Sequence, residues 1–341
     1  MRNKLLKKTI LLTAVFAGIW LIGGCTSSRH EYEKITFAMD TVMTMKAYST
    51  ESTDVLEKAE ELIQSIESDV SVTDENSVIY SLNKNKSARL TEISSDLLSA
   101  ALSYCKETDG ALNISIYPVV KAWGFTTDTQ QVPSDDTIAQ LVKNVDYEKI
   151  SLDDTTVSIP SDMEVDLGAV TKGYTSDRVI SLLRENGIKN AIISLGGNVQ
   201  VIGNRPDGKP WNVAIQDPFS KEYAGVVAIT DKAAVTSGDY ERYFEENGVR
   251  YHHIMDPATG RPARSSLSSV TIVSESGIKA DALSTSLFVM GLDKATAYWK
   301  ENQDFEAIFI TNDGEIYITH GLSADFTPMG NYTKNKINII E

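Results

Sequence analysis

The chain is poor in cysteine and histidine. Its 341 residues include two cysteines, Cys25 and Cys105. Because Cys25 closes a signal-like N-terminal segment, Cys105 has no partner within the chain, which excludes a disulfide framework. Cys105 lies on an apolar helical stripe and is interpreted as a small buried hydrophobic residue. The four histidines lack the close Cys/His spacing of zinc sites, so zinc is disfavoured.

Basic residues are also scarce. The chain has 32 Lys and Arg against 47 Asp and Glu, a formal charge of −15 that becomes −19 without the four basic and no acidic residues of the first 24 positions. A surface this acidic argues against nucleic-acid binding, which depends on Lys and Arg that neutralise phosphates. It argues equally against electrostatic adsorption to anionic lipid.

The sequence has no apolar run long enough to predict a membrane span of about 20 residues. The apolar stretch Thr9–Ile22 follows a basic start and ends in Gly23-Gly24-Cys25, a pattern typical of a bacterial lipoprotein signal. We therefore expect a signal peptide over 1–24, acylation at Cys25, a lipid-anchored tether over 25–34 and one domain, with one or two lobes, over 35–341. This predicts a location at the extracytoplasmic face of a bacterial membrane.

Internal repeats and a G-x-G-x-x-G dinucleotide motif are absent. Hydrophobic periodicity predicts helices over 54–68, 95–108 and 135–144 and from positions 278 and 292. Strands are expected over 35–48, 111–120, 191–195, 211–216, 225–230, 251–255 and 269–274, with hairpins around 153–154 and 312–314. Residues 77–83 fit a short helix or a strand. Helices and hairpins without regular βαβ alternation favour an α+β fold with antiparallel sheets.

Three clusters carry candidate chemistry. In D-L-G-A-V-T-K-G-Y, Lys172 near a helix start could pair with phosphate, or be an ordinary surface lysine. Asp281 and Thr285 lie four residues apart on one helical face, where their oxygens could bind a hard cation or serve the helix itself. His252 and His253 must point to opposite faces of a strand, so at most one can act as a general base at a given site.

These segments occur in one order with further ones, namely G-G-N at 196–198, W-N-V-A-I-Q-D-P, V-T-S-G-D-Y-E-R and H-H-I-M-D-P-A-T-G-R-P. Together they resemble the ApbE-type FAD:protein FMN transferases, from Met39 to about Gly321. The resemblance implies a T-fold-like α+β domain. It also implies an enzyme that moves FMN from FAD to a threonine or serine hydroxyl of an exported acceptor flavoprotein, releasing AMP.

The resemblance further implies site residues. Mg²⁺ would bind Asp281, Thr285 and the backbone carbonyl of Ala169, and His253 would be the catalytic base. FAD would contact a set drawn from six segments: Met39, Tyr80, Ala111, Leu112, Asn113, Asp166, Lys172, Ser237, Gly238 and Met255. Asp40 stands where the family usually has glycine in M-G-T.

Two other functions use the same residues. A FAD pyrophosphatase would need the same metal and base but water as nucleophile. A non-catalytic flavin-binding lipoprotein would need neither the Asp281/Thr285 pair nor His253, so their presence favours an enzyme. The expected acceptor is a subunit of a membrane-associated redox system.

Overall fold

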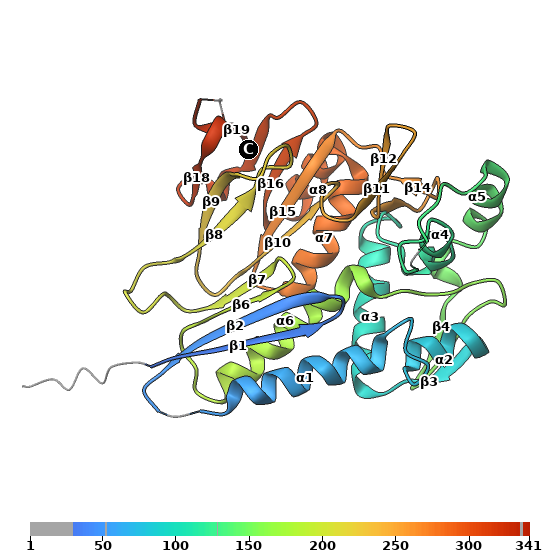
Figure 1. Ribbon diagram of the computed structural model, residues 1–341, viewed down its shortest axis with the longest axis horizontal. Helices are drawn as coiled ribbons and strands as arrows, with labels where there is room; N and C mark the ends of the chain where they lie inside the picture. Colours follow the sequence, from blue (N-terminus) through green and yellow to red (C-terminus); the bar gives the residue numbers. More distant parts are fainter. Residues whose placement is uncertain (1–29, 52, 128, 335–336) are drawn as a thin grey trace, which may run out of the picture.

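The fold is built on a nine-stranded sheet (Figure 1). The computed structural model describes residues 30–341 except 52, 128, 335 and 336. In spatial order the strands are β1 (His30–Ala38), β2 (Thr41–Ser49), β6 (Ala191–Leu195), β7 (Asn198–Ile202), β10 (Ala233–Gly238), β15 (Leu267–Ser274), β16 (Glu306–Thr311), β17 (Ile316–Thr319) and β19 (Asn338–Ile340). All neighbours are antiparallel except β17 and β19. The α+β prediction is confirmed.

Each face of this sheet is covered by a separate layer. One face carries the helices α1 (Val55–Val70), α6 (Gly168–Glu185), α7 (Gly277–Met290) and α8 (Leu292–Asn302). The other face packs against a three-stranded sheet of β8 (Trp211–Gln216), β9 (Tyr223–Ile229) and β18 (Phe326–Pro328). The apolar residues of β15 are buried throughout because both of its faces are covered, as expected of a central strand.

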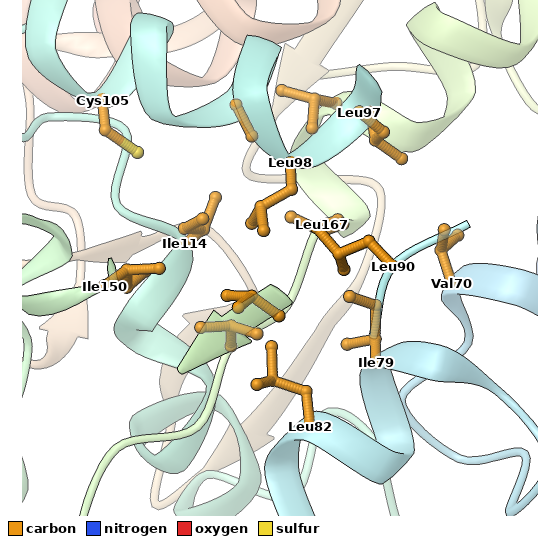
Figure 2. Packing of buried hydrophobic residues seen from close by; sticks show 14 of the residues in the cluster. Val70, Ile79, Leu82, Leu90, Leu97, Leu98, Cys105, Ile114, Ile150 and Leu167 are labelled. Atoms are coloured by element: carbon orange, nitrogen blue, oxygen red, sulfur yellow. The ribbon is translucent and has the colours of Figure 1, made fainter. Parts of the chain in front are cut away.

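A further helical layer lies beyond α6. The helices α2 (Val78–Asn85) and α3 (Glu92–Glu107) share a core with the small sheet of β3 (Ser87–Arg89), β4 (Ser151–Asp153) and β5 (Thr156–Ser158). Figure 2 shows this core, in which Leu90 and Leu167 lie between Ile79 and Leu82 of α2 and Leu97 and Leu98 of α3. Cys105 is buried there, and burial raises the pKa of its thiol to about 12, which confirms it as a core residue.

The remaining elements form a small lobe next to α7. It contains α4 (Tyr117–Ala122), α5 (Asp135–Val142) and two hairpins, β11 (Tyr243–Glu246) with β12 (Val249–His252) and β13 (Met255–Asp256) with β14 (Arg261–Pro262). The Trp123 indole donates to the Gly260 carbonyl oxygen at 2.9 Å and so joins the end of α4 to the second hairpin.

Three predicted strands differ from the structure. The strand expected over 251–255 ends at His252, and a separate strand, β13, begins at Met255. Residues 35–48 form the hairpin β1–β2, whose turn residues Met39 and Asp40 have φ of 51° and 57°. Aspartate tolerates this left-handed backbone, which explains how Asp40 stands where glycine is usual. Residues 111–120 are not a strand but a 3₁₀ turn (Ile114–Ile116) followed by α4. The Asn113 side chain accepts from the Ser115 amide at 3.1 Å, which starts the helical turn despite the β-branched residues that follow.

Several other expectations can be placed on the structure. Residues 77–83 belong to helix α2, and the predicted helices and the two hairpins form close to the expected positions. Strand β1 begins at His30, inside the segment expected to be a tether. The expected signal peptide and Cys25 lie outside the described residues. Among the described residues, no helix is both long enough and apolar enough to cross a membrane.

Candidate functional site

The site is organised by the close crossing of α6 and α7. A Cβ atom added at Gly173 would lie 2.4 Å from the Gly277 carbonyl oxygen and 2.6 Å from Cβ of Asp281. One added at Gly277 would lie 2.3 Å from Ser176 Oγ. Real Cβ atoms do not come this close, so both glycines are required for the two helices to touch. Gly173, the glycine of K-G-Y, therefore allows α6 and α7 to pack closely, and this places the neighbouring Lys172 next to α7.

The N-terminus of α7 is held by a residue of α6. The carboxylate of Asp177 accepts from the backbone amides of Gly277 at 2.7 Å and Ile278 at 3.0 Å, and from the Ser276 hydroxyl at 3.0 Å. A carboxylate at this position satisfies amides that have no partner within their own helix and complements the helix dipole. Asp177 thus fixes α7 against α6 one turn before Asp281.

Asp281 is buried at the crossing. Its Oδ2 accepts from the Gly173 backbone amide at 2.7 Å. This bond ties Asp281 of α7 to α6 one turn after Ala169, another of the predicted Mg²⁺ ligands. Burial raises the pKa of Asp281 to about 6, while the positive charge of Lys172 acts in the opposite direction. A cation next to this carboxylate would favour its ionised form.

Hydroxyl groups continue the polar surface along α7. Ser237 Oγ lies 2.8 Å from Ser284 Oγ and 3.3 Å from Thr285 Oγ1, so the predicted residues of β10 and α7 do meet. Gly238 is in contact with the Tyr240 ring, because a Cβ added there would lie 2.3 Å from a ring carbon. Thr285 therefore presents a hydroxyl one turn beyond Asp281, as the spacing predicts.

Lys172 lies among four titratable groups. Its charge lowers the pKa of Asp166, Glu241 and Asp281, and lowers that of His253 as well. In the described part of the chain, no carboxylate lies within ion-pairing distance of its ammonium group. Of these acids only Asp281 is buried, whereas Asp166 is half-buried and Glu241 is exposed. Loss of hydration nevertheless raises the pKa of Glu241 to about 7. An unpaired ammonium beside groups from α6, α7 and the small lobe is suited to an anionic ligand.

His253 follows the last residue of β12 and faces the small lobe. Its Nδ1 lies 3.2 Å from the Arg242 carbonyl oxygen, and its ring meets the Phe125 ring edge-on at 6.3 Å. Burial, together with the charges of Arg242 and Lys172, lowers its pKa to about 3. The imidazole is therefore neutral at neutral pH and able to accept a proton.

His252 and His253 contact different groups, but only His252 lies in β12, so the predicted strand alternation does not account for their directions. Its Nε2 lies 3.0 Å from the Ala263 carbonyl oxygen, and its ring packs edge-on against Phe288 of α7. Burial lowers its pKa as well. His252 thus belongs to the core between β12 and α7.

Asp166 and the segment before α4 lie together. Asp166 donates its backbone amide to the Ile114 carbonyl at 2.8 Å, and its Oδ1 accepts from the Gly168 amide at 2.9 Å at the start of α6. Burial raises the pKa of this carboxyl. The backbone of Asp166 therefore lies beside Ile114, the residue that follows the predicted segment Ala111, Leu112 and Asn113, and Leu112 itself is buried in the core.

Three predicted FAD contacts are placed by their neighbours. Met39 packs against α6, where Thr175 Oγ1 lies 4.0 Å from its sulfur. Tyr80 lies on α2, which is tied to the residue before Asp166 because Asn83 bonds both backbone groups of Val165. Met255 is buried with Phe125, the residue that meets His253. No hydrogen bond among the described residues joins Tyr80 or Met255 to Lys172.

Sequence reasoning missed Asn198, Glu241 and Arg242 as individual site residues. All three lie in segments singled out by their motifs, but only the fold shows which of their atoms face the site. Two surface hollows elsewhere, one between α8 and β19 and one near Arg184 and Asp231, contain none of the predicted residues. The described residues contain no group of three His, Cys, Asp or Glu side chains able to hold a metal alone.

Comparison with known proteins places the chain in a family. Residues 39–309 match the ApbE family. A FAD:protein FMN transferase of Treponema pallidum is 31% identical over 92% of this chain and 93% of its own length, and one of Klebsiella pneumoniae is 36% identical over 68% and 73%. The crystal structure of an ApbE protein from Thermotoga maritima superposes with a TM-score of 0.81 at 33% identity, over 86% of this chain and 98% of that one. The chain belongs to the ApbE family.

Proposed function

We propose that this ApbE family member transfers FMN from FAD to a threonine or serine hydroxyl of an acceptor protein and releases AMP. Curated relatives of similar length carry the name FAD:protein FMN transferase, and one similar structure is a flavin transferase of Vibrio cholerae. The observation that carries the proposal is the position of Lys172. Its positive charge lowers the pKa of both Asp281 and His253, which supports a pyrophosphate site that the cation ligands and the base share.

The residues at the crossing fit Mg²⁺. Asp281, Thr285 and the Ala169 carbonyl offer oxygen atoms only, the ligands that hard cations prefer. A single carboxylate leaves coordination positions for substrate phosphate and water, which Mg²⁺ usually retains. When bound, Mg²⁺ would supply positive charge to the phosphoryl oxygens of FAD. Asp281 would be held for this role by the Gly173 amide.

His253 is suited to accept the proton of the acceptor hydroxyl. A carbonyl oxygen can only accept, so Nδ1 of His253 donates to Arg242 and the lone pair lies on Nε2. The phosphates of FAD would bring negative charge next to Lys172. That charge would raise the low pKa of His253 and make it a stronger base in the complex.

The reaction balances as a phosphoryl substitution. The acceptor oxygen forms a bond to the FMN phosphorus while the pyrophosphate P–O bond breaks, and AMP leaves with the bond electrons. The hydroxyl proton goes to Nε2 of His253. The product is FMN in phosphoester linkage to the acceptor. Lys172 would hold the pyrophosphate in line during this exchange.

The proposal is tested by incubating the protein with FAD, Mg²⁺ and an exported redox subunit in its apo form. Mass spectrometry of the intact acceptor should show the added mass of one FMN phosphoester, and its loss when the acceptor threonine or serine is changed to alanine. Free FMN and AMP without labelled acceptor would instead identify a FAD pyrophosphatase.

We also propose a location. The basic start, apolar stretch and Gly24-Cys25 boundary support acylation of Cys25 and anchoring to the outer face of a bacterial membrane. There the enzyme would meet acceptor flavoproteins of membrane-associated redox systems.

A further inference from the structure

Asn198 is a buried amide without a partner. Only 2% of its surface is exposed, and neither side-chain atom, Nδ2 or Oδ1, makes a hydrogen bond within the described residues. The observation does not depend on which atom is nitrogen, because both lack partners. Buried side-chain amides are nearly always hydrogen-bonded, so an orphaned one indicates a group that is absent from the protein alone.

The strand geometry directs Asn198 to the α6–α7 crossing. Gln200 lies two residues further along β7 and hence on the same face. Its Nε2 donates to Asp177 at 2.8 Å, and its Oε1 lies close to Gly277 at the start of α7. Two residues of strand and one turn of helix are of similar length, about 6 Å. Gln200 lies beside Gly277, so Asn198, two residues earlier on the strand, lies beside Asp281, one turn later on the helix.

Contact with Asp281 is close but incomplete. The Asn198 side chain acts as a hydrogen-bonding neighbour that lowers the pKa of the Asp281 carboxyl, but the distance and angle between the two groups fall outside those of a formed hydrogen bond. Asp281 has one firm donor, the Gly173 amide on Oδ2. A second donor on the carboxylate would hold its plane and favour its ionised form.

We propose that Asn198 is a positioning residue for Asp281, whose amide completes its hydrogen bonds when a divalent cation and the pyrophosphate of FAD occupy the site. The inference rests on the proposed function. Nδ2 donates to the carboxylate of Asp281 in the loaded site, and Oδ1 faces water or a donor brought by the ligand. The glycine pair before Asn198 places it at the first position of β7.

The test compares Asn198→Leu with Gln200→Leu, a matched control on the same strand face whose amide nitrogen is bonded to Asp177. Thermal unfolding and FAD fluorescence are measured without ligand and with Mg²⁺, FAD or both. Asn198→Leu should melt no lower than the wild type without ligand, since no bond is lost. Its FAD affinity should fall about tenfold or more in Mg²⁺ and stay unchanged without it. Gln200→Leu should melt lower and keep its Mg²⁺ dependence.

Other outcomes overturn the inference. If Asn198→Leu melts as low as Gln200→Leu and keeps its Mg²⁺-dependent affinity, Asn198 is structural. If Asn198→Leu does not fold, Asn198→Ala is measured in its place, because it removes the amide without added bulk. If neither variant folds, Asn198 is structural and the inference is wrong. Asp281→Ala is measured alongside. If Asp281→Ala loses the dependence of FAD affinity on Mg²⁺ but Asn198→Leu keeps it, only the role of Asn198 is rejected. If Asp281→Ala keeps that dependence, the proposed cation site itself is rejected.

Discussion

The carbonyl oxygen of Arg242 accepts two hydrogen bonds from His253, from the backbone amide at 3.0 Å and from Nδ1 at 3.2 Å. The pair arises because Tyr243 lies opposite His252 in the β11–β12 hairpin, which brings the preceding and following residues together. The bond to Nδ1 fixes the tautomer, so Nε2 carries the lone pair. This relationship supports the proposed role of His253 as the base, whereas His252 packs in the core.

Replacement of His253 with alanine should separate catalysis from binding. The base acts on the acceptor hydroxyl and contacts the dinucleotide little, so transfer should fall by about 10²-fold or more. FAD affinity should change much less. Flavin fluorescence measures binding, and the FMN mass on the acceptor measures transfer. Equal losses of both would make His253 a pocket residue.

His252→Ala is the control for that experiment. Its ring is bonded to Ala263 and packed on Phe288, so its loss should lower stability more than turnover. A larger catalytic loss in His252→Ala than in His253→Ala would show that His252, and not His253, is the base.

Stability should depend on pH through His253. Its pKa is about 3 in the folded protein against about 6.5 when unfolded, so the unfolded chain binds the proton first as pH falls. The free energy of unfolding should therefore decrease between about pH 6.5 and about pH 3, by at most about 1.4 kcal/mol per pH unit for one proton. Above that window His253 contributes no pH dependence.

Urea denaturation of wild type and His253→Gln at several pH values checks this. Below about pH 6.5 the free energy of unfolding should decrease less steeply in the variant than in the wild type. The part of the pH dependence that comes from His252, whose pKa is also lowered, should remain. Identical pH slopes would contradict the burial of a neutral His253.

Gly173→Ala should destabilise the protein. Its Cβ would meet the Gly277 carbonyl oxygen at 2.4 Å, and backbone cannot shift as a flexible side chain can. Overpacking of this kind costs about 1–3 kcal/mol, and movement of Asp281 should also weaken activity. Gly168→Ala is the control, because its closest contact is the Asp166 carboxylate at 3.2 Å. Equal stability of the two variants by urea denaturation would refute the need for glycine at the crossing.

Cys25→Ser tests the proposed anchor. Serine cannot be acylated at this position, so the variant should leave the membrane fraction, where the wild type should be retained after cell fractionation. Mass spectrometry of the wild type should show a lipidated Cys25 at the mature N-terminus. Wild-type protein found in the cytoplasm with its first 24 residues attached would disprove the location.

Local patterns predicted most of the elements. Amphipathic spacing identified α1 and α3, and turn residues located the hairpins at Asp154 and Gly314, both of which have positive φ. The failures have local causes that periodicity does not report. The Asn113 side chain starts a helical turn, and Met39 and Asp40 adopt left-handed backbone inside an alternating run.

The site was predictable as a set of motifs but not as an arrangement. The spacing of Asp281 and Thr285 placed both on one face of α7, because helical geometry alone determines it. The crossing that brings Lys172 to Asp281 depends on Gly173 and Gly277, which are far apart in sequence. The orphaned amide of Asn198 likewise becomes visible only once β7 is placed against α6 and α7.

The most direct measurement is the ratio of AMP released to FMN attached to the acceptor, in wild type and in Asp281→Ala at ordinary Mg²⁺ concentration. The wild type should give one AMP for each FMN-modified acceptor, since a single P–O bond is exchanged. Asp281→Ala should give neither product while circular dichroism shows an intact fold. AMP release without acceptor modification, or full transfer by a folded Asp281→Ala protein, would contradict the account.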